Sequence, residues 1–234
     1  MRTFVVGDIH GHVAKLRALM PELRERAESG DSLVFVGDFV DRGPESKAVI
    51  SDVMRLSSDE WPGPVTALMG NHEDMMLDWI SSQPRLDPAV WIHNGGLDTI
   101  HSYTGQRKID RKWVNSVPLG HLNFLRNLAY FHEDEHGYYV HAGFLPGLPP
   151  SETPREEMCW IRDKFINSDY AWDRVVVFGH TPQYDNPPEP VTDYSQLLWR
   201  PLIRPEKIGI DTGAAYGGPL TAVILPEREF VSAR

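Results

Sequence analysis

The sequence has little of several features that define whole classes of protein. It contains one cysteine, Cys159, which excludes an internal disulfide framework and a cysteine-rich zinc knuckle. A single thiol is in keeping with a reducing compartment. Its neighbours Met158 and Trp160 favour a packed side chain over the alternative, a catalytic nucleophile.

Positive charge is also scarce. The 234 residues include 23 Lys and Arg against 33 Asp and Glu, which gives a formal net charge of −10, and no block of five or six basic residues occurs. Proteins that bind nucleic acid carry a basic surface for the phosphate backbone, so nucleic acid is not an expected partner.

Long apolar runs are missing as well. No stretch approaches the roughly 20 apolar residues that a membrane span needs. The chain enters the pattern RTFVVGD at once, without room for the charged and apolar regions of a signal peptide. We therefore expect a soluble, cytoplasmic protein with no membrane partner.

Short apolar segments rich in β-branched and aromatic residues recur along the chain. They read TFVVGD, SLVFVGD, VTALMGN, YYVHAG, VVVFGH, KIGIDTG and LTAVILP. Nearly continuous apolar runs of this length are typical of strands that are covered on both faces. Helical patterns over 12–29 and 45–58 separate the first three, which predicts parallel strands joined by crossover helices.

The rest of the chain completes the predicted fold. Residues 74–128 have a helical pattern rich in tryptophan and predict a helical insert, while LAYFHEDEHGYYVHAG resembles a hairpin that turns at 134–137. The segment DNPPEPV is typical of a proline-rich surface loop. With 41% hydrophobic residues the chain can bury a sizeable core. We expect an α/β fold in one domain spanning 1–234, with a central β-sandwich or open sheet flanked by helices.

Five of the expected strands end alike, in polar side chains beside glycine. In open α/β sheets the carboxyl ends of the strands border the ligand crevice, and glycine lets the backbone turn sharply there. One such end alone is more often a turn than a site, but five together predict that the polar tips converge. The residues are Asp8 and His10 in VVGDIHG, Asp38, Asp41 and Arg42 in FVGDFVDRGP, Asn71 and His72 in LMGNHE, His141 in YVHAG, and His180 in VFGHT.

This set of side chains indicates a metal site. Imidazole, carboxylate and amide ligands without thiolate suit divalent transition metals, whereas a purely oxygen site would suit magnesium or calcium. A carboxylate can bridge two ions, and two-metal sites in phosphatases and nucleases activate water and neutralise phosphoryl groups. We expect two divalent transition-metal ions, manganese first, with Fe, Zn, Co and Ni as alternatives. The other histidines lack partner spacing and are expected to be surface or structural residues: His12, His93, His101, His121, His132 and His136.

The motifs GDIHG, GDFVDRG, GNHE, HAG and GHT, in this order, resemble those of the phosphoprotein phosphatases among the calcineurin-like metallophosphoesterases. IDTGAAYGGPLTA extends the likeness nearly to the end, and CWIRDKF and NGG resemble the bacterial and bacteriophage-lambda type of serine/threonine phosphatase. Symmetrical diadenosine tetraphosphate hydrolases share this framework but have VARG and GNHD where this chain has VDRG and GNHE. The resemblance implies a metallophosphoesterase fold and serine/threonine protein phosphatase activity, with the tetraphosphate hydrolase as the alternative.

The resemblance also implies a role for each residue. A metal-bridging hydroxide would attack phosphorus, and His72, oriented by Asp41, would protonate the leaving oxygen. Arg42 and, through WIRD, Arg162 would clamp the phosphate, and Tyr216 in IDTGAAYGG is a further candidate substrate-binding residue. The implied metal ligands are Asp8, His10 and Asp38 for the first ion and Asp38, Asn71, His141 and His180 for the second, with Asp38 bridging.

Two alternatives stay open. Arg162 can instead be a surface arginine paired with Asp163 or a glutamate. A binding module that keeps the fold without catalysis is the alternative to an enzyme, but such a module is expected to have lost a ligand or His72, and none is missing here. The expected partner is a phosphorylated protein or peptide, and the sequence leaves the oligomeric state open.

Overall fold

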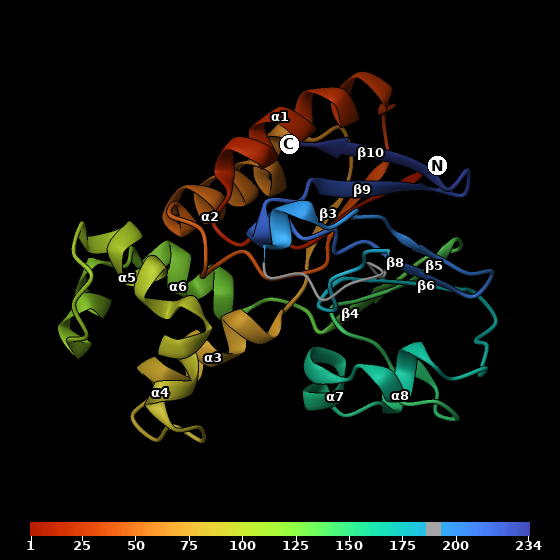
Figure 1. The fold of residues 1–234 in the computed structure, drawn as a ribbon. Coiled ribbons are helices and arrows are strands. Elements are labelled where there is room, and N and C mark those ends of the chain that lie inside the picture. The colour runs from red at the N-terminus through yellow and green to blue at the C-terminus, as the bar shows by residue number, and fades with distance from the viewer. Residues whose placement is uncertain (186–192) are drawn as a thin grey trace.

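The computed structural model describes residues 1–185 and 193–234, so nearly all of the predicted proline-rich loop DNPPEPV lies outside the described residues. Two five-stranded sheets form the centre of the molecule (Figure 1), with strand orders β10-β9-β1-β2-β3 and β4-β5-β6-β8-β7. The first sheet consists of β1 (Thr3–Val6), β2 (Ser32–Phe35), β3 (Val65–Ala67), β9 (Leu220–Leu225) and β10 (Glu229–Ala233). The second consists of β4 (Phe131–Glu133), β5 (Gly137–Val140), β6 (Val175–Phe178), β7 (Leu202–Ile203) and β8 (Lys207–Gly209).

The predicted parallel pairing is confirmed. In the first sheet β1, β2 and β3 are parallel neighbours, and in the second β5, β6 and β8 are. The expected hairpin forms between β4 and β5, which pair antiparallel across the turn at 134–137. Of the two architectures expected from the sequence, the structure has the sandwich, because side chains such as Val5 and Val34 of one sheet pack against Tyr139 and Val177 of the other.

Helices cover the outer faces of both sheets. α1 and α2 lie over the first sheet and α7 and α8 over the second, while α3 to α6 lie together to one side (Figure 1). The helices are α1 (Val13–Arg26), α2 (Ser46–Arg55), α3 (Asn71–Ile80), α4 (Pro88–Trp91), α5 (Leu97–Thr104), α6 (Leu119–Arg126), α7 (Arg155–Trp160) and α8 (Asp163–Ile166). π-helical turns follow α2 (Leu56–Glu60) and α4 (Ile92–Gly96), and 3₁₀ turns lie at Arg111–Ser116, Pro150–Glu152, Tyr194–Gln196 and Ala214–Tyr216.

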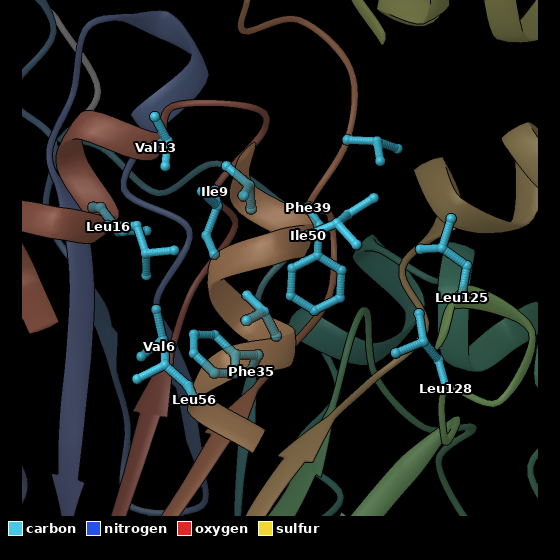
Figure 2. Close-up of a cluster of buried hydrophobic side chains, with 14 of the residues drawn as sticks. Val6, Ile9, Val13, Leu16, Phe35, Phe39, Ile50, Leu56, Leu125 and Leu128 are labelled. Carbon is cyan, nitrogen blue, oxygen red and sulfur yellow. The ribbon is translucent and has the colours of Figure 1, made fainter. Parts of the chain in front are cut away.

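The core beneath α1 and α2 explains why these segments are helical. Their apolar residues recur at the spacing of one helix face, and that face is buried against the first sheet. Figure 2 shows Val13 and Leu16 of α1 and Ile50 of α2 close to Val6 and Phe35 from the strands. Each of these five side chains is at most 2% exposed.

Helices α3 to α6 fill the stretch predicted to be a helical insert, and tryptophan rings form their centre. Trp91 and Trp113 stack with centroids 5.5 Å apart, and Trp79 packs against both, at 5.3 and 6.1 Å. All three rings are buried, so the tryptophans of this segment belong to its core. Within the described part of the chain, no helix is both long enough and apolar enough to cross a bilayer.

Candidate metal centre

The carboxyl ends of the parallel strands of both sheets meet at one place. Asp38 lies at its centre and is 2% exposed. Its Oδ2 is 3.3 Å from Nε2 of His10, which follows β1, and its Oδ1 is 3.4 Å from Nε2 of His141, which follows β5. One carboxylate therefore faces imidazoles from both sheets, as a bridging ligand requires.

A second group of donors surrounds Asn71 at the start of α3. Its Oδ1 is 3.0 Å from Nε2 of His141 and 3.0 Å from Nδ1 of His180. The other ring nitrogen of His141 lies 2.9 Å from the carbonyl oxygen of Val36. A carbonyl partner on one ring nitrogen fixes the imidazole orientation and leaves the other nitrogen for a metal.

Two close sets of ligand atoms follow from this geometry. One comprises His10, Asp38 and His72, and the other comprises Asp38, His141 and His180. Each set is buried, and the shared Asp38 makes the pair fit a dinuclear site. Asp8 is in neither set. Its Oδ2 accepts a hydrogen bond from the backbone N–H of His180 at 2.9 Å.

Two buried polar atoms at this centre lack a hydrogen-bond partner among the described residues. They are Oδ1 of Asp8 and Nε2 of His180. Leaving a buried carboxylate oxygen or imidazole nitrogen unpaired costs free energy that a bound cation would recover. Gly179 lets the Asp8 carboxylate lie close to the backbone before His180, because a Cβ on residue 179 would lie 2.0 Å from Asp8 Oδ1. The donor chemistry and these two orphan atoms fit divalent transition metals.

The electrostatics of the centre favour metal binding. Burial lowers the pKa of His10, His141 and His180, which favours the neutral form whose lone pair can coordinate a metal. Burial opposes ionisation of Asp38, but the imidazoles of His141, His72 and His10 outweigh it and hold its pKa well below the usual range. Burial raises the pKa of Asp8, and the nearby Asp211 and Asp38 raise it further.

His72 is held differently from the other imidazoles. Its Nδ1 lies 2.8 Å from Oδ2 of Asp41, and its Nε2 lies 3.9 Å from Oδ2 of Asp38. Asp41 is fully buried and also accepts from Trp91 Nε1 at 2.9 Å and Thr99 Oγ1 at 2.6 Å. The motifs predict the pairing of Asp41 with His72, but not the two residues of the helical segment, Trp91 and Thr99, that fix Asp41.

Glu73 has a structural role that the sequence did not predict. Its carboxylate accepts hydrogen bonds from the backbone N–H groups of Asp38, Phe39, Val40 and Gly70, at 2.8 to 3.1 Å. Burial raises its pKa to about 8, with the nearby Asp38 adding to the rise and these N–H groups opposing it. Glu73 thereby holds the loop that carries Asp38. A glutamate at the third position of a helix was the available signal.

The two candidate phosphate-binding arginines lie on either side of the centre. Nη1 of Arg42 is 3.0 Å from Nε2 of His10, and its guanidinium lies over the ring of Tyr216, 5.2 Å from the centroid. Nη1 of Arg162 donates to the carbonyl oxygen of His180 and to Thr181 Oγ1, both at 3.2 Å. Among the described residues Arg162 forms no ion pair, either with Asp163 or with a glutamate.

Asp211 was missed altogether, although its signal was present. It follows β8, is 4% exposed, and lies close enough to raise the pKa of Asp8. Burial raises the pKa of Asp211 itself to about 6. The stretch KIGIDTG repeats the pattern of an apolar strand followed by aspartate near glycine, and it marks a sixth strand end at the same centre.

The backbone at the centre is unusual. Six non-glycine residues among the described ones have positive φ, and five of them belong to this site. They are His10 (47°), Asp38 (54°), Asp41 (71°), Arg42 (65°) and His180 (62°), with Arg228 (57°) elsewhere. Aspartate and histidine adopt this conformation more readily than other side chains, but it remains uncommon.

Comparison with known proteins agrees with the fold and the site. The family model of the calcineurin-like phosphoesterases matches residues 1–210. The chain is 39% identical to serine/threonine-protein phosphatase 2 of Escherichia coli, over 93% of this chain and 90% of that protein. It is 26% identical to the asymmetrical bis(5′-nucleosyl)-tetraphosphatase PrpE of Oceanobacillus iheyensis, over 99% of this chain and 92% of that protein. The crystal structure of a candidate diadenosine tetraphosphatase superposes with a TM-score of 0.68 at 22% identity, over 99% of this chain and 92% of that one.

These findings confirm the family expected from the five motifs. Relatives of both substrate classes match nearly the whole length of the chain, and the buried clusters around Asp38 fit the dinuclear site of metal-dependent phosphoesterases. The chain belongs to the calcineurin-like phosphoesterases and is a metal-dependent phosphoester hydrolase.

Proposed function

We propose that the protein is a serine/threonine protein phosphatase. The observation that carries the proposal is the buried pair of His72 and Asp41, 2.8 Å apart, beside the carboxylate of Asp38. The alkoxide of serine or threonine is a poor leaving group and needs a proton as the bond to phosphorus breaks. With Nδ1 engaged by Asp41, Nε2 of His72 is the nitrogen available to deliver that proton.

The metal ligands follow from the same geometry. We assign Asp8, His10 and Asp38 to the first ion. In the first of the two close sets of ligand atoms, Asp8 thus replaces His72, because Oδ1 of Asp8 is buried and has no hydrogen-bond partner among the described residues. The second ion is assigned to Asp38, Asn71, His141 and His180. Bound divalent ions, for which manganese is our first choice, supply an activated water and neutralise charge on the phosphoryl group.

The arginines complete the proposed site. The planar guanidinium of Arg42 suits two phosphoryl oxygens at once, and Tyr216 beneath it fixes its orientation. Arg162 lies on the other side, held by the carbonyl of His180. We propose that both bind the phosphoryl oxygens, where they stabilise the charge that builds up in the transition state.

The alternative is hydrolysis of bis(5′-nucleosyl) tetraphosphates, since relatives with that name match nearly the whole chain at 26% identity. The deciding experiment measures kcat/KM of the manganese-loaded protein on a phosphoserine peptide, a phosphothreonine peptide and diadenosine tetraphosphate. We expect the peptides to be the better substrates, because Asp41 and Glu73 follow the protein-phosphatase form of their motifs. A much higher kcat/KM for the dinucleotide would assign the protein to the alternative.

A further inference from the structure

Four aromatic side chains form a connected cluster that begins at Arg42 and reaches the surface. The rings of Tyr216 and Trp199 stack with centroids 6.1 Å apart and planes 10° apart. Tyr194 packs against Tyr216 at 5.4 Å, and Tyr184 packs against Trp199 at 5.5 Å. We call Tyr184, Tyr194, Trp199 and Tyr216 the aromatic shelf.

The backbone holds the rings of the aromatic shelf in place. Tyr184 and Trp199 face each other across an antiparallel bridge, and the Trp199 ring lies directly on Gly213, where a Cβ would be 2.4 Å away. The two outer rings stay open to solvent, since Tyr194 is 55% and Tyr184 42% exposed. Exposed aromatic rings supported from below are typical of surfaces that bind other proteins.

We propose that the aromatic shelf binds a large apolar side chain of the phosphorylated peptide whose phosphate lies at Arg42. This inference rests on the proposed phosphatase function and gives it a sequence preference. The guanidinium of Arg42 is 5.2 Å from the Tyr216 centroid, and the centroid of the Tyr194 ring is 5.4 Å from that of Tyr216. An extended peptide advances about 3.3–3.6 Å per residue. A side chain two or three positions from the phosphorylated residue therefore reaches Tyr194.

The charges around the shelf favour a peptide over a nucleotide. In the described parts of 183–200 the one basic side chain is Arg200, and its Nε lies 3.3 Å from Oδ2 of Asp185. A dinucleoside polyphosphate has phosphates beyond the one at the metal centre, and these need free cations along the shelf. A further cation near Tyr216 is Lys15, and its Nζ already donates to the carbonyl oxygens of Ala214 and Gly218. A phosphopeptide places one phosphate at Arg42 and a neutral ring on Tyr184 or Tyr194, which the shelf accommodates.

The test is a panel of phosphoserine peptides in which Trp, Phe or Ala is placed, one at a time, at each of the three positions before and after the phosphoserine. With wild-type, manganese-loaded protein, we expect Trp or Phe two or three positions away to raise kcat/KM about tenfold over Ala, through KM. In Tyr194→Ala the ratio of kcat/KM for the Trp and Ala peptides should fall toward one. Tyr170→Ala is the matched control, because Tyr170 is similarly exposed at 40% but packs on Trp172 outside the shelf.

Each outcome decides between distinct conclusions. If p-nitrophenyl phosphate is hydrolysed but no phosphopeptide is, the proposed function fails and the inference falls with it. If phosphopeptides are hydrolysed with a ratio near one at every position, the inference alone is overturned. If Tyr194→Ala raises the KM for diadenosine tetraphosphate and leaves the peptide ratios intact, the shelf holds a nucleobase, and the peptide assignment is wrong.

Discussion

Nδ1 of His72 lies 2.8 Å from Oδ2 of Asp41, and neither side chain is more than 1% exposed. This contact separates His72 from the histidines assigned to the metals, because one of its ring nitrogens is engaged by a carboxylate of its own.

Replacing His72 should therefore affect chemistry more than metal binding. We expect His72→Asn to lower kcat on phosphoserine peptides by about 10²–10⁴. The loss on p-nitrophenyl phosphate should be much smaller, since its phenolate leaves with little help from an acid. Steady-state kinetics on both substrates, with metal content by elemental analysis, check the prediction. Equal losses on the two substrates, or an emptied metal site, would show that His72 is not the acid.

Metal removal should inactivate and destabilise the protein together. The assigned ligands come from both sheets, so ions bound to them would stabilise the folded state by mass action, by about 2.7 kcal/mol at a hundredfold excess over Kd. We expect chelator to abolish phosphatase activity and lower Tm, and manganese to restore both. Asp38→Asn should show the low Tm and low metal content even with manganese present. Full activity of metal-free protein would contradict the site assignment.

Gly95 connects the helical segment to Arg42, the proposed phosphate ligand. It has φ of 106°, and a Cβ there would lie 2.6 Å from the backbone nitrogen of Arg42. Gly95→Ala should displace Arg42 and raise KM for phosphate esters, with metal content unchanged. Gly105→Ala is the matched control, since Gly105 also has positive φ, 72°, but nothing lies within 4 Å of its Cβ position. If both variants change KM equally, backbone strain rather than the contact with Arg42 is responsible.

Stability should depend on pH through Asp31, far from the metal centre. Burial opposes its ionisation, but hydrogen bonds from Arg2 and the N–H of Glu28 outweigh it and lower the pKa of Asp31. A carboxyl with a lowered pKa stabilises the fold above its unfolded-state pKa, about 3.9. That contribution is lost as pH falls from there through the folded-state pKa.

Asp31→Asn should accordingly lower the free energy of unfolding by about 1–3 kcal/mol at pH 7. The difference from wild type should shrink below pH 4. Urea unfolding at pH 7 and pH 3.5 measures it, with the exposed Glu22→Gln as the control. A difference that stays constant between the two pH values would mean that packing, not charge, accounts for the loss.

The sequence predicted the fold well because its signals were local. Buried parallel strands are continuous apolar runs, and the seven expected segments are the strands β1, β2, β3, β5, β6, β8 and β9. The polar strand ends were visible for the same reason, since Gly-Asp and Gly-His pairs directly follow those runs. The two short strands β4 and β7 carry a weaker signal, and β4 was placed only through its hairpin.

What the sequence could not supply was contact between distant segments. Thr99 and Trp91 reach Asp41 from helices more than forty positions along the chain, and nothing in their own neighbourhood marks them as polar partners. Asp211 was overlooked for a different reason. The residues after its strand, Thr212 and Gly213, also suit an ordinary turn, and only the neighbouring β6 places the carboxylate at the metal centre.

The five site residues with positive φ set the protein's function against its own stability. A residue with a Cβ atom costs roughly 1–2 kcal/mol more in the left-handed backbone conformation than in the right-handed one. Glycine avoids that cost. Selection of random variants for heat resistance alone would therefore enrich glycine at a position such as Arg42, where φ is 65° and the side chain is only partly buried. The most heat-resistant variants in such a library would be folded but catalytically inactive. A thermostable hydrolase must therefore gain its stability at other positions in the chain.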